Sequence, residues 1–154
     1  MGAVAKDLSG YRPNNSMSMS ESNRIGTLAE LSVQRDLLNN GFNVSVPIDD
    51  YSYDLIAEWD GEFTRIQVKN GHIKDNSLRA SLDSYIRGEN KEYKDDDFDI
   101  LAVYHPDCDD CYYADWSEIG NTMFQVYIGD MDELMPMHLA QTNLPSEHKI
   151  DKLK

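Results

Sequence analysis

The chain has 154 residues, a mass of 17.6 kDa and a formal net charge of −14 at pH 7. This length predicts one domain with a sizeable core, and a hydrophobic content of 40% argues against wholesale disorder. No apolar run approaches the roughly 18 residues of a membrane span, and no secretory signal pattern is present. We therefore expect an intracellular, cytoplasmic protein that makes no contact with a membrane.

The charge is distributed unevenly along the sequence. Residues 63–94 contain seven Lys and Arg against four Asp and Glu, whereas the remainder contains seven against 24. A strongly acidic protein is a poor match for nucleic acid, which normally requires a basic footprint. The less negative stretch predicts that one face meets phosphate while the acidic remainder is solvated. A high-salt cytoplasm would also explain an acidic surface.

The N-terminal part of the sequence predicts an arm followed by a helix. Residues 1–20 are rich in Ser, Asn and Gly without hydrophobic periodicity, which indicates a flexible arm. Ser20 or Ser22 then caps a helix that Gly41 ends. At about 100° per residue, Glu30 points toward an apolar side of this helix. A Glu at the edge of an amphipathic stripe is usually an ordinary surface residue, so its role depends on what lies beside it.

The centre of the sequence predicts a β-hairpin. Residues 53–59 and 62–69 read as strands on either side of Asp60-Gly61, a dipeptide that favours a two-residue type I′ turn. Such a turn fixes the register of the strands, because Trp59 must then pair with Glu62.

This register brings three polar side chains together. Asp54 falls directly opposite Gln67, with the Cβ atoms roughly 5 Å apart. Alternation puts Lys69 on the same face, while Ile66 and Val68 point to the other face and into apolar cover.

The remaining elements can be read in chain order. The sequence predicts an edge strand over 42–47, a short helix or a loop over 77–87, a central strand over 98–104, its hairpin partner over 111–114, a strand over 123–128 and a helical turn over 131–138.

The polar face of the hairpin suits phosphodiester cleavage. A carboxylate, an amide and an ammonium group are costly to desolvate together, so their presence on one face indicates a functional site. Asp54 and the oxygen of Gln67 can hold a hard divalent cation, and Lys69 can orient the attacking water or stabilise charge on the phosphate. The plainer alternative is a half-exposed hairpin whose polar face meets water.

The order of these residues resembles a known nuclease superfamily. A helix with Glu30, then Tyr53-Asp54, then Gln67-Val68-Lys69 and a Tyr-rich strand with Asp99 are similar to the PD-(D/E)XK nucleases over roughly residues 22–128. The chain most resembles intron-encoded homing endonucleases and archaeal Holliday-junction resolvases.

The resemblance implies a fold and a division of the chain. The fold is α/β (α+β), with a restriction-endonuclease-like core in which an N-terminal helix precedes a mixed β-sheet with a catalytic hairpin, in the order αβββαβ. The nuclease domain would span residues 21–130, and residues 131–154 would form a C-terminal extension.

The resemblance also implies a divalent-metal-dependent DNA endonuclease that uses Mg²⁺ or Mn²⁺. By this resemblance, the catalytic residues would be Glu30, Asp54, Gln67 and Lys69. The first three, with the backbone carbonyl of Val68, would hold the metal. Two positions depart from the family pattern. Tyr53 stands in place of Pro, and Gln67 replaces the second acid, which removes one negative charge from the metal site.

The less negative stretch supplies the expected DNA contacts, which are His72, Lys74, Arg79 and Arg87. Cutting both strands with one site per chain favours a homodimer or homotetramer. A competing hypothesis is a catalytically inactive nuclease-like fold that binds DNA or protein. Gln67 and the net charge of −14 support that alternative.

Cys108 and Cys111 have the spacing of a zinc half-site, but the sequence offers no second pair. Two thiols that flank a turn, or a reversible disulfide, fit this spacing better.

Overall fold

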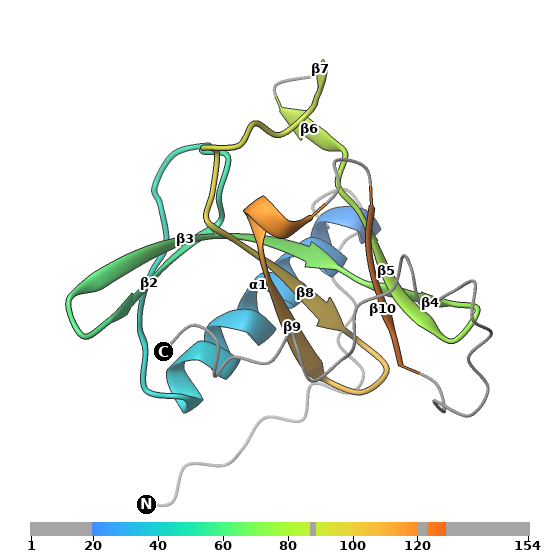
Figure 1. Cartoon of the computed structure of the whole chain (residues 1–154), viewed down its shortest axis with the longest axis horizontal. Helices are drawn as coiled ribbons and strands as arrows, with labels where there is room; N and C mark the ends of the chain where they lie inside the picture. Colours follow the sequence, from blue (N-terminus) through green and yellow to red (C-terminus); the bar gives the residue numbers. More distant parts are fainter. Residues whose placement is uncertain (1–19, 87–88, 120–122, 129–154) are drawn as a thin grey trace, which may run out of the picture.

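The computed structural model describes residues 20–86, 89–119 and 123–128 (Figure 1). Residues 1–19 of the expected arm, the C-terminal extension over 131–154 and the helical turn expected there lie outside these ranges. Within the described ranges, no helix is both long enough and apolar enough to cross a membrane. The elements are α1 (Glu21–Asn39), β1 (Asn43–Ser45), β2 (Leu55–Trp59), β3 (Glu62–Asn70), β4 (His72–Lys74), β5 (Ser77–Ser81), β6 (Ser84–Ile86), β7 (Glu89–Lys91), β8 (Ile100–His105), β9 (Asp110–Asp115), the 3₁₀ helix η2 (Trp116–Glu118) and β10 (Met123–Tyr127).

A five-stranded mixed sheet forms the centre of the fold, in the order β1-β2-β3-β8-β9. β3 and β8 are parallel, and the other neighbours are antiparallel. β8 lies between β3 and β9, and its residues Leu101, Ala102 and Val103 are all fully buried. A strand covered on both faces needs such a continuous apolar run. The predicted mixed sheet, the central strand and the 111–114 hairpin partner are therefore confirmed.

Helix α1 forms as the sequence predicts. The Ser20 hydroxyl accepts a hydrogen bond from the Asn23 backbone N–H at 3.3 Å, which caps the first turn. Beyond the last turn, Gly41 adopts a φ of +88°, a conformation that favours glycine. The helix lies across the sheet in Figure 1 and packs one stripe onto it, composed of Ala29, Val33 and Leu37.

The β2–β3 hairpin has the predicted register. Trp59 pairs with Glu62 across the turn, and Leu55 pairs with Ile66 at the other end. The turn residues Asp60 and Gly61 both have positive φ, at 51° and 83°, as a type I′ turn requires. Since β2 begins only at Leu55, the last residues of β3, from Gln67 to Asn70, extend past it.

The two faces of the sheet are covered by different cores. On one face Ile66, Val68 and Ala102 pack against α1. On the other face Leu101 and Val103 belong to a second core that also contains residues of β5, β9 and β10. Because strands alternate, the side chains of Gln67 and Lys69 belong to the second face, away from α1.

The short helix or loop expected over 77–87 is wrong for the described residues of that segment. Ser77–Ser81 is strand β5 and Ser84–Ile86 is strand β6, so strands occupy the place of the second helix in the αβββαβ order. Leu78, Ala80 and Leu82 are buried with a period of two, which is the strand pattern. β5 pairs with β10 and β4 to form a three-stranded sheet at the end of β3 that lies opposite the hairpin turn (Figure 1).

Candidate active site

The side chains of Asp54 and Gln67 are hydrogen-bonded at the start of β2, where Asp54 directly precedes the strand. The Asp54 backbone N–H donates to the Ile66 carbonyl at 2.9 Å, which extends the hairpin by one residue. One oxygen of the Asp54 carboxylate then accepts two hydrogen bonds, from Gln67 Nε2 at 2.6 Å and from the Val68 backbone N–H at 2.8 Å. Gln67 is only 7% exposed, so this contact is shielded from water. The register predicted from the turn thus places Asp54 beside Gln67.

Burial governs the charge on Asp54. Desolvation raises the pKa of its carboxyl group, and this effect exceeds the lowering by the Val68 hydrogen bond and by the positive charge of Lys69. Burial destabilises the ionised form of such a carboxylate, and a cation beside it would offset this desolvation cost.

Lys69 is half-buried on the same face of β3 as Gln67. Its ammonium group donates to the Asp83 carbonyl at 3.2 Å and lies over the Tyr93 ring, 5.2 Å from the centroid. Desolvation lowers the pKa of Lys69, while the charges of Asp54 and Asp83 oppose that lowering. The ammonium is therefore held within electrostatic reach of the Asp54 carboxylate.

Glu30 comes to the site from the other core. It lies on α1, which covers the Ile66 and Val68 face, whereas Gln67 and Lys69 occupy the opposite face. The Glu30 carboxyl is half-buried, and its pKa is raised first by desolvation and then by the Asp54 charge. Glu30 is thus electrostatically coupled to Asp54, although its helix does not share the face of Lys69.

The donors present fit a hard divalent cation. Asp54 has a second carboxylate oxygen, Glu30 is a carboxylate that senses the Asp54 charge from the other core, and the Val68 carbonyl points to the same side as its N–H. In the described part of the chain, no three His, Cys, Asp or Glu side chains gather closely enough to hold a metal. The groups named above offer oxygen atoms only, which are the ligands that hard divalent cations prefer.

Gln67 presents its nitrogen, not its oxygen, to Asp54. The same Nε2 also donates to the Val68 carbonyl at 3.2 Å. For the Gln67 oxygen to reach a cation beside Asp54, the side-chain amide would rotate by about 180°, a rearrangement that exchanges two atoms of nearly equal size.

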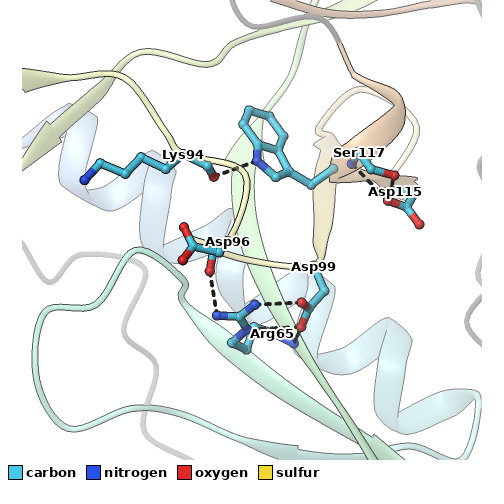
Figure 2. A network of polar contacts seen from close by, with 7 residues as sticks. Arg65, Lys94, Asp96, Asp99, Asp115 and Ser117 are labelled. Carbon is cyan, nitrogen blue, oxygen red and sulfur yellow. Dashed lines mark hydrogen bonds and ion pairs between the residues drawn. The ribbon is translucent and has the colours of Figure 1, made fainter.

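The loop 93–99 runs along the Gln67–Lys69 face, which the sequence did not predict. Arg65, on β3, donates to the Asp96 carbonyl at 2.7 Å and to both carboxylate oxygens of Asp99, at 2.8 and 3.2 Å (Figure 2). Tyr93, at the start of this loop, contacts Lys69. No local sequence signal identifies Tyr93, because its place depends on a contact between segments 24 residues apart.

The expected DNA-contacting residues lie on the small sheet that follows β3. His72 and Lys74 are exposed on β4. Arg79 pairs with His72 across the strands, but its guanidinium is mostly covered and forms an ion pair with Asp75 at 3.3 Å. Arg87 lies outside the described residues. Lys74 is consequently better placed than Arg79 for contact with an external phosphate.

Cys108 is exposed and Cys111 is buried, and no disulfide joins the two thiols. Burial raises the pKa of Cys111 to about 12, so this thiol stays protonated and is a poor zinc ligand.

Comparison with known proteins identifies the family. The family model of the PD-(D/E)XK endonucleases matches residues 20–142. The chain belongs to this family. Membership assigns it to a group of nucleases.

Two individual proteins are similar to this PD-(D/E)XK family member. Protein 5.3 of Escherichia phage T7 is 31% identical over 103 residues, which cover 66% of this chain and 86% of the phage protein. The solved structure of the bacterial homing endonuclease I-Ssp6803I matches with a TM-score of 0.60 and 20% identity, over 79% of this chain and 86% of that one. The second likeness confirms the restriction-endonuclease-like fold.

Proposed function

We propose that this protein is a divalent-metal-dependent DNA endonuclease, of the homing-endonuclease or junction-resolvase type. The observation that carries the proposal is the contact of Asp54 with Gln67 at the start of β2, with the Lys69 ammonium on the same face. Family membership and the fold support a nuclease. The desolvation of Asp54 and Lys69 supports an active site over a merely solvated strand face.

Each side chain has a role that its surroundings allow. Asp54, Glu30, the Val68 carbonyl and, after amide rotation, Gln67 would hold Mg²⁺ or Mn²⁺. When bound, such a cation supplies Lewis-acid chemistry at the scissile phosphate. Lys69 stabilises negative charge as it develops on the phosphate, or orients the water that attacks in line. The Asp83 carbonyl and the Tyr93 ring restrict the ammonium so that it acts from one direction.

The small sheet and the oligomer complete the proposal. Lys74 and His72, exposed on β4, are proposed to contact the DNA backbone next to the site. One site per chain favours a homodimer or homotetramer, because the cleavage of two strands then needs two symmetric copies.

The test is cleavage of supercoiled plasmid and of a four-way junction with Mg²⁺, Mn²⁺ or EDTA. We expect metal-dependent nicking or resolution by the wild type and loss of it in Asp54→Ala. Glu62→Gln removes an exposed acid from the same hairpin and should retain full activity. A wild type that cuts neither substrate with either metal would contradict the proposal.

A specific observation favours the second candidate, which is a nuclease-like fold that binds DNA or protein without cutting. Gln67 donates a hydrogen bond to Asp54, and this contact satisfies the carboxylate without a cation. Under this alternative, Gln67→Ala would leave every metal-dependent property unaltered, whereas the endonuclease proposal requires a change.

A further inference from the structure

The ammonium of Lys69 is held between two groups that the metal site does not use. It donates to the Asp83 carbonyl at 3.2 Å, and it lies 5.2 Å from the centroid of the Tyr93 ring. A cation within about 6 Å of an aromatic face is attracted by the ring quadrupole, and the attraction grows when the pair is desolvated. The long side chain of lysine otherwise has many rotamers, so this contact selects among them.

The Tyr93 ring is itself fixed by two buried aromatic residues. It meets Phe98 edge-on, with centroids 5.0 Å apart and an interplanar angle of 84°. It meets Trp116 in the same manner, at 6.0 Å and 83°. Phe98 is 1% exposed and Trp116 is 6% exposed, so both belong to the core. Packing against the core therefore fixes the plane of the Tyr93 ring.

The backbone that carries Tyr93 is fixed as well. The Trp116 indole N–H donates to the carbonyl of Lys94, the next residue, at 2.9 Å. The Lys94 backbone N–H donates to the Asp97 carboxylate at 2.8 Å, which closes a turn. Arg65 then holds the far end of this loop at Asp96 and Asp99 (Figure 2). Since Arg65 and Lys69 share one face of β3, the strand and the loop are joined at both ends.

We propose that Tyr93 is a positioning residue, whose ring face holds the Lys69 ammonium over the Asp54–Gln67 site instead of allowing it to extend into solvent. The inference deepens the proposed function, on which its catalytic consequence rests. Tyr93 does not touch the reacting phosphate in this account. Its effect is exerted through Lys69, and the aromatic ring carries that effect, not the hydroxyl.

Lysine-selective NMR of the metal-free full chain tests the geometry without reference to activity. The signal of the Lys69 methylene next to the ammonium is assigned as the one that Lys69→Arg lacks. In the wild type and Tyr93→Phe, this signal should be shifted upfield by the ring current. In Tyr93→Leu and Tyr93→Met it should return to the ordinary lysine position. Unchanged signals in both folded aliphatic variants would overturn the proposal.

Cleavage kinetics then test the consequence. Tyr93→Leu should lower the single-turnover rate about tenfold, with no change in the metal concentration required, and Tyr93→Phe should match the wild type. Tyr51→Leu, an exposed aromatic, is the control. Equal rates in Tyr93→Leu and wild type would overturn the positioning role. A wild type without cleavage contradicts the proposed function, and the NMR result still decides whether Tyr93 holds Lys69.

Discussion

The side-chain amide of Gln67 donates a hydrogen bond of 2.6 Å to the carboxylate of Asp54. In the correspondence that we propose with the PD-(D/E)XK motif, Gln67 stands where the motif has an acid. Here, the neutral donor stabilises an ionised, half-buried Asp54 where a second carboxylate would repel it. The metal-free site is therefore less strained than one with two acids, and its affinity for a cation should be correspondingly lower.

Gln67→Glu should lower the stability of the metal-free protein and raise its affinity for the metal. Without metal, the new carboxylate faces Asp54 across a contact of 2.6 Å, and the melting temperature should fall by several degrees. With Mg²⁺ the stability should be recovered, because ligand binding stabilises only the folded chain. Cleavage should persist and reach its half-maximal rate at lower Mg²⁺, whereas Gln67→Ala should need more metal.

Thermal unfolding with EDTA and across a Mg²⁺ titration measures both effects. Ser45→Glu, which adds the same charge at an exposed position of β1, is the control and should show no metal dependence. If the melting temperature of Gln67→Glu does not change with Mg²⁺ concentration, Gln67 does not adjoin a cation site.

Asp54→Asn should stabilise the metal-free protein at neutral pH. Burial raises the pKa values of Asp54 and Glu30 above their ordinary 3.8 and 4.5, so the folded chain binds these protons more tightly than the unfolded chain. That stability is present at acidic pH and is lost as pH rises through the raised values. Asn carries no charge, so the variant does not lose this stability at neutral pH. Each 1 kcal/mol gained in the free energy of unfolding should raise the melting temperature by about 2–4 °C.

Melting temperatures in EDTA from pH 3 to pH 7, roughly the span over which a perturbed carboxyl titrates, measure this effect. Asp49→Asn alters an exposed acid with only a local hydrogen bond and should leave the curve unchanged. If Asp54→Asn melts below the wild type at pH 7, the desolvation assigned to Asp54 is wrong.

Lys69→Ala should separate metal binding from chemistry. The Mg²⁺-induced rise in melting temperature should survive, because Lys69 is not a ligand, while the single-turnover rate falls about 10²–10³-fold. The wild-type rate should also decline at alkaline pH. Because burial lowers the pKa of Lys69 below its ordinary 10.5, the ammonium is lost earlier than from an exposed lysine. Lys74→Ala, on exposed β4, should retain the wild-type rate at saturating DNA.

Lys74→Glu should weaken DNA binding and reduce the slope of log K against log salt by about one or more. Arg79→Glu should act in the same direction but less strongly, because Arg79 is mostly covered and paired with Asp75. Arg35→Glu breaks another exposed ion pair, with Asp109, far along α1 and serves as the control. Binding titrations in Ca²⁺ at several salt concentrations decide the matter, and unchanged affinity in both small-sheet variants would exclude this DNA footprint.

Local signals predicted the hairpin and its consequences. Asp60-Gly61 determines the turn, the turn determines the register, and the register places Asp54 beside Gln67. The Ser20 cap and Gly41 bounded the helix in the same way. These features depend on contacts between residues that are close in the sequence, where pattern and propensity agree.

Long-range contacts decided what the sequence did not reveal. The segment 77–86 is extended because β5 pairs with β10, more than 40 residues later, although its Leu78 and Ala80 alternation was already a strand signal. Tyr93 reaches Lys69 from the 93–99 loop, which contacts with Arg65 and Trp116 hold in place. The side of the sheet that α1 covers, and hence the separation of Glu30 from the Lys69 face, likewise has no local signature.

The most direct test of a catalytic Asp54 is Mg²⁺-dependent cleavage by Asp54→Asn, measured beside its stability and its DNA affinity in Ca²⁺. We predict that this variant melts above the wild type without metal, binds DNA about as well, and cuts at least about 10²-fold more slowly. Loss of activity could not then be attributed to unfolding. An Asp54→Asn protein that cuts DNA at the wild-type rate would contradict the account.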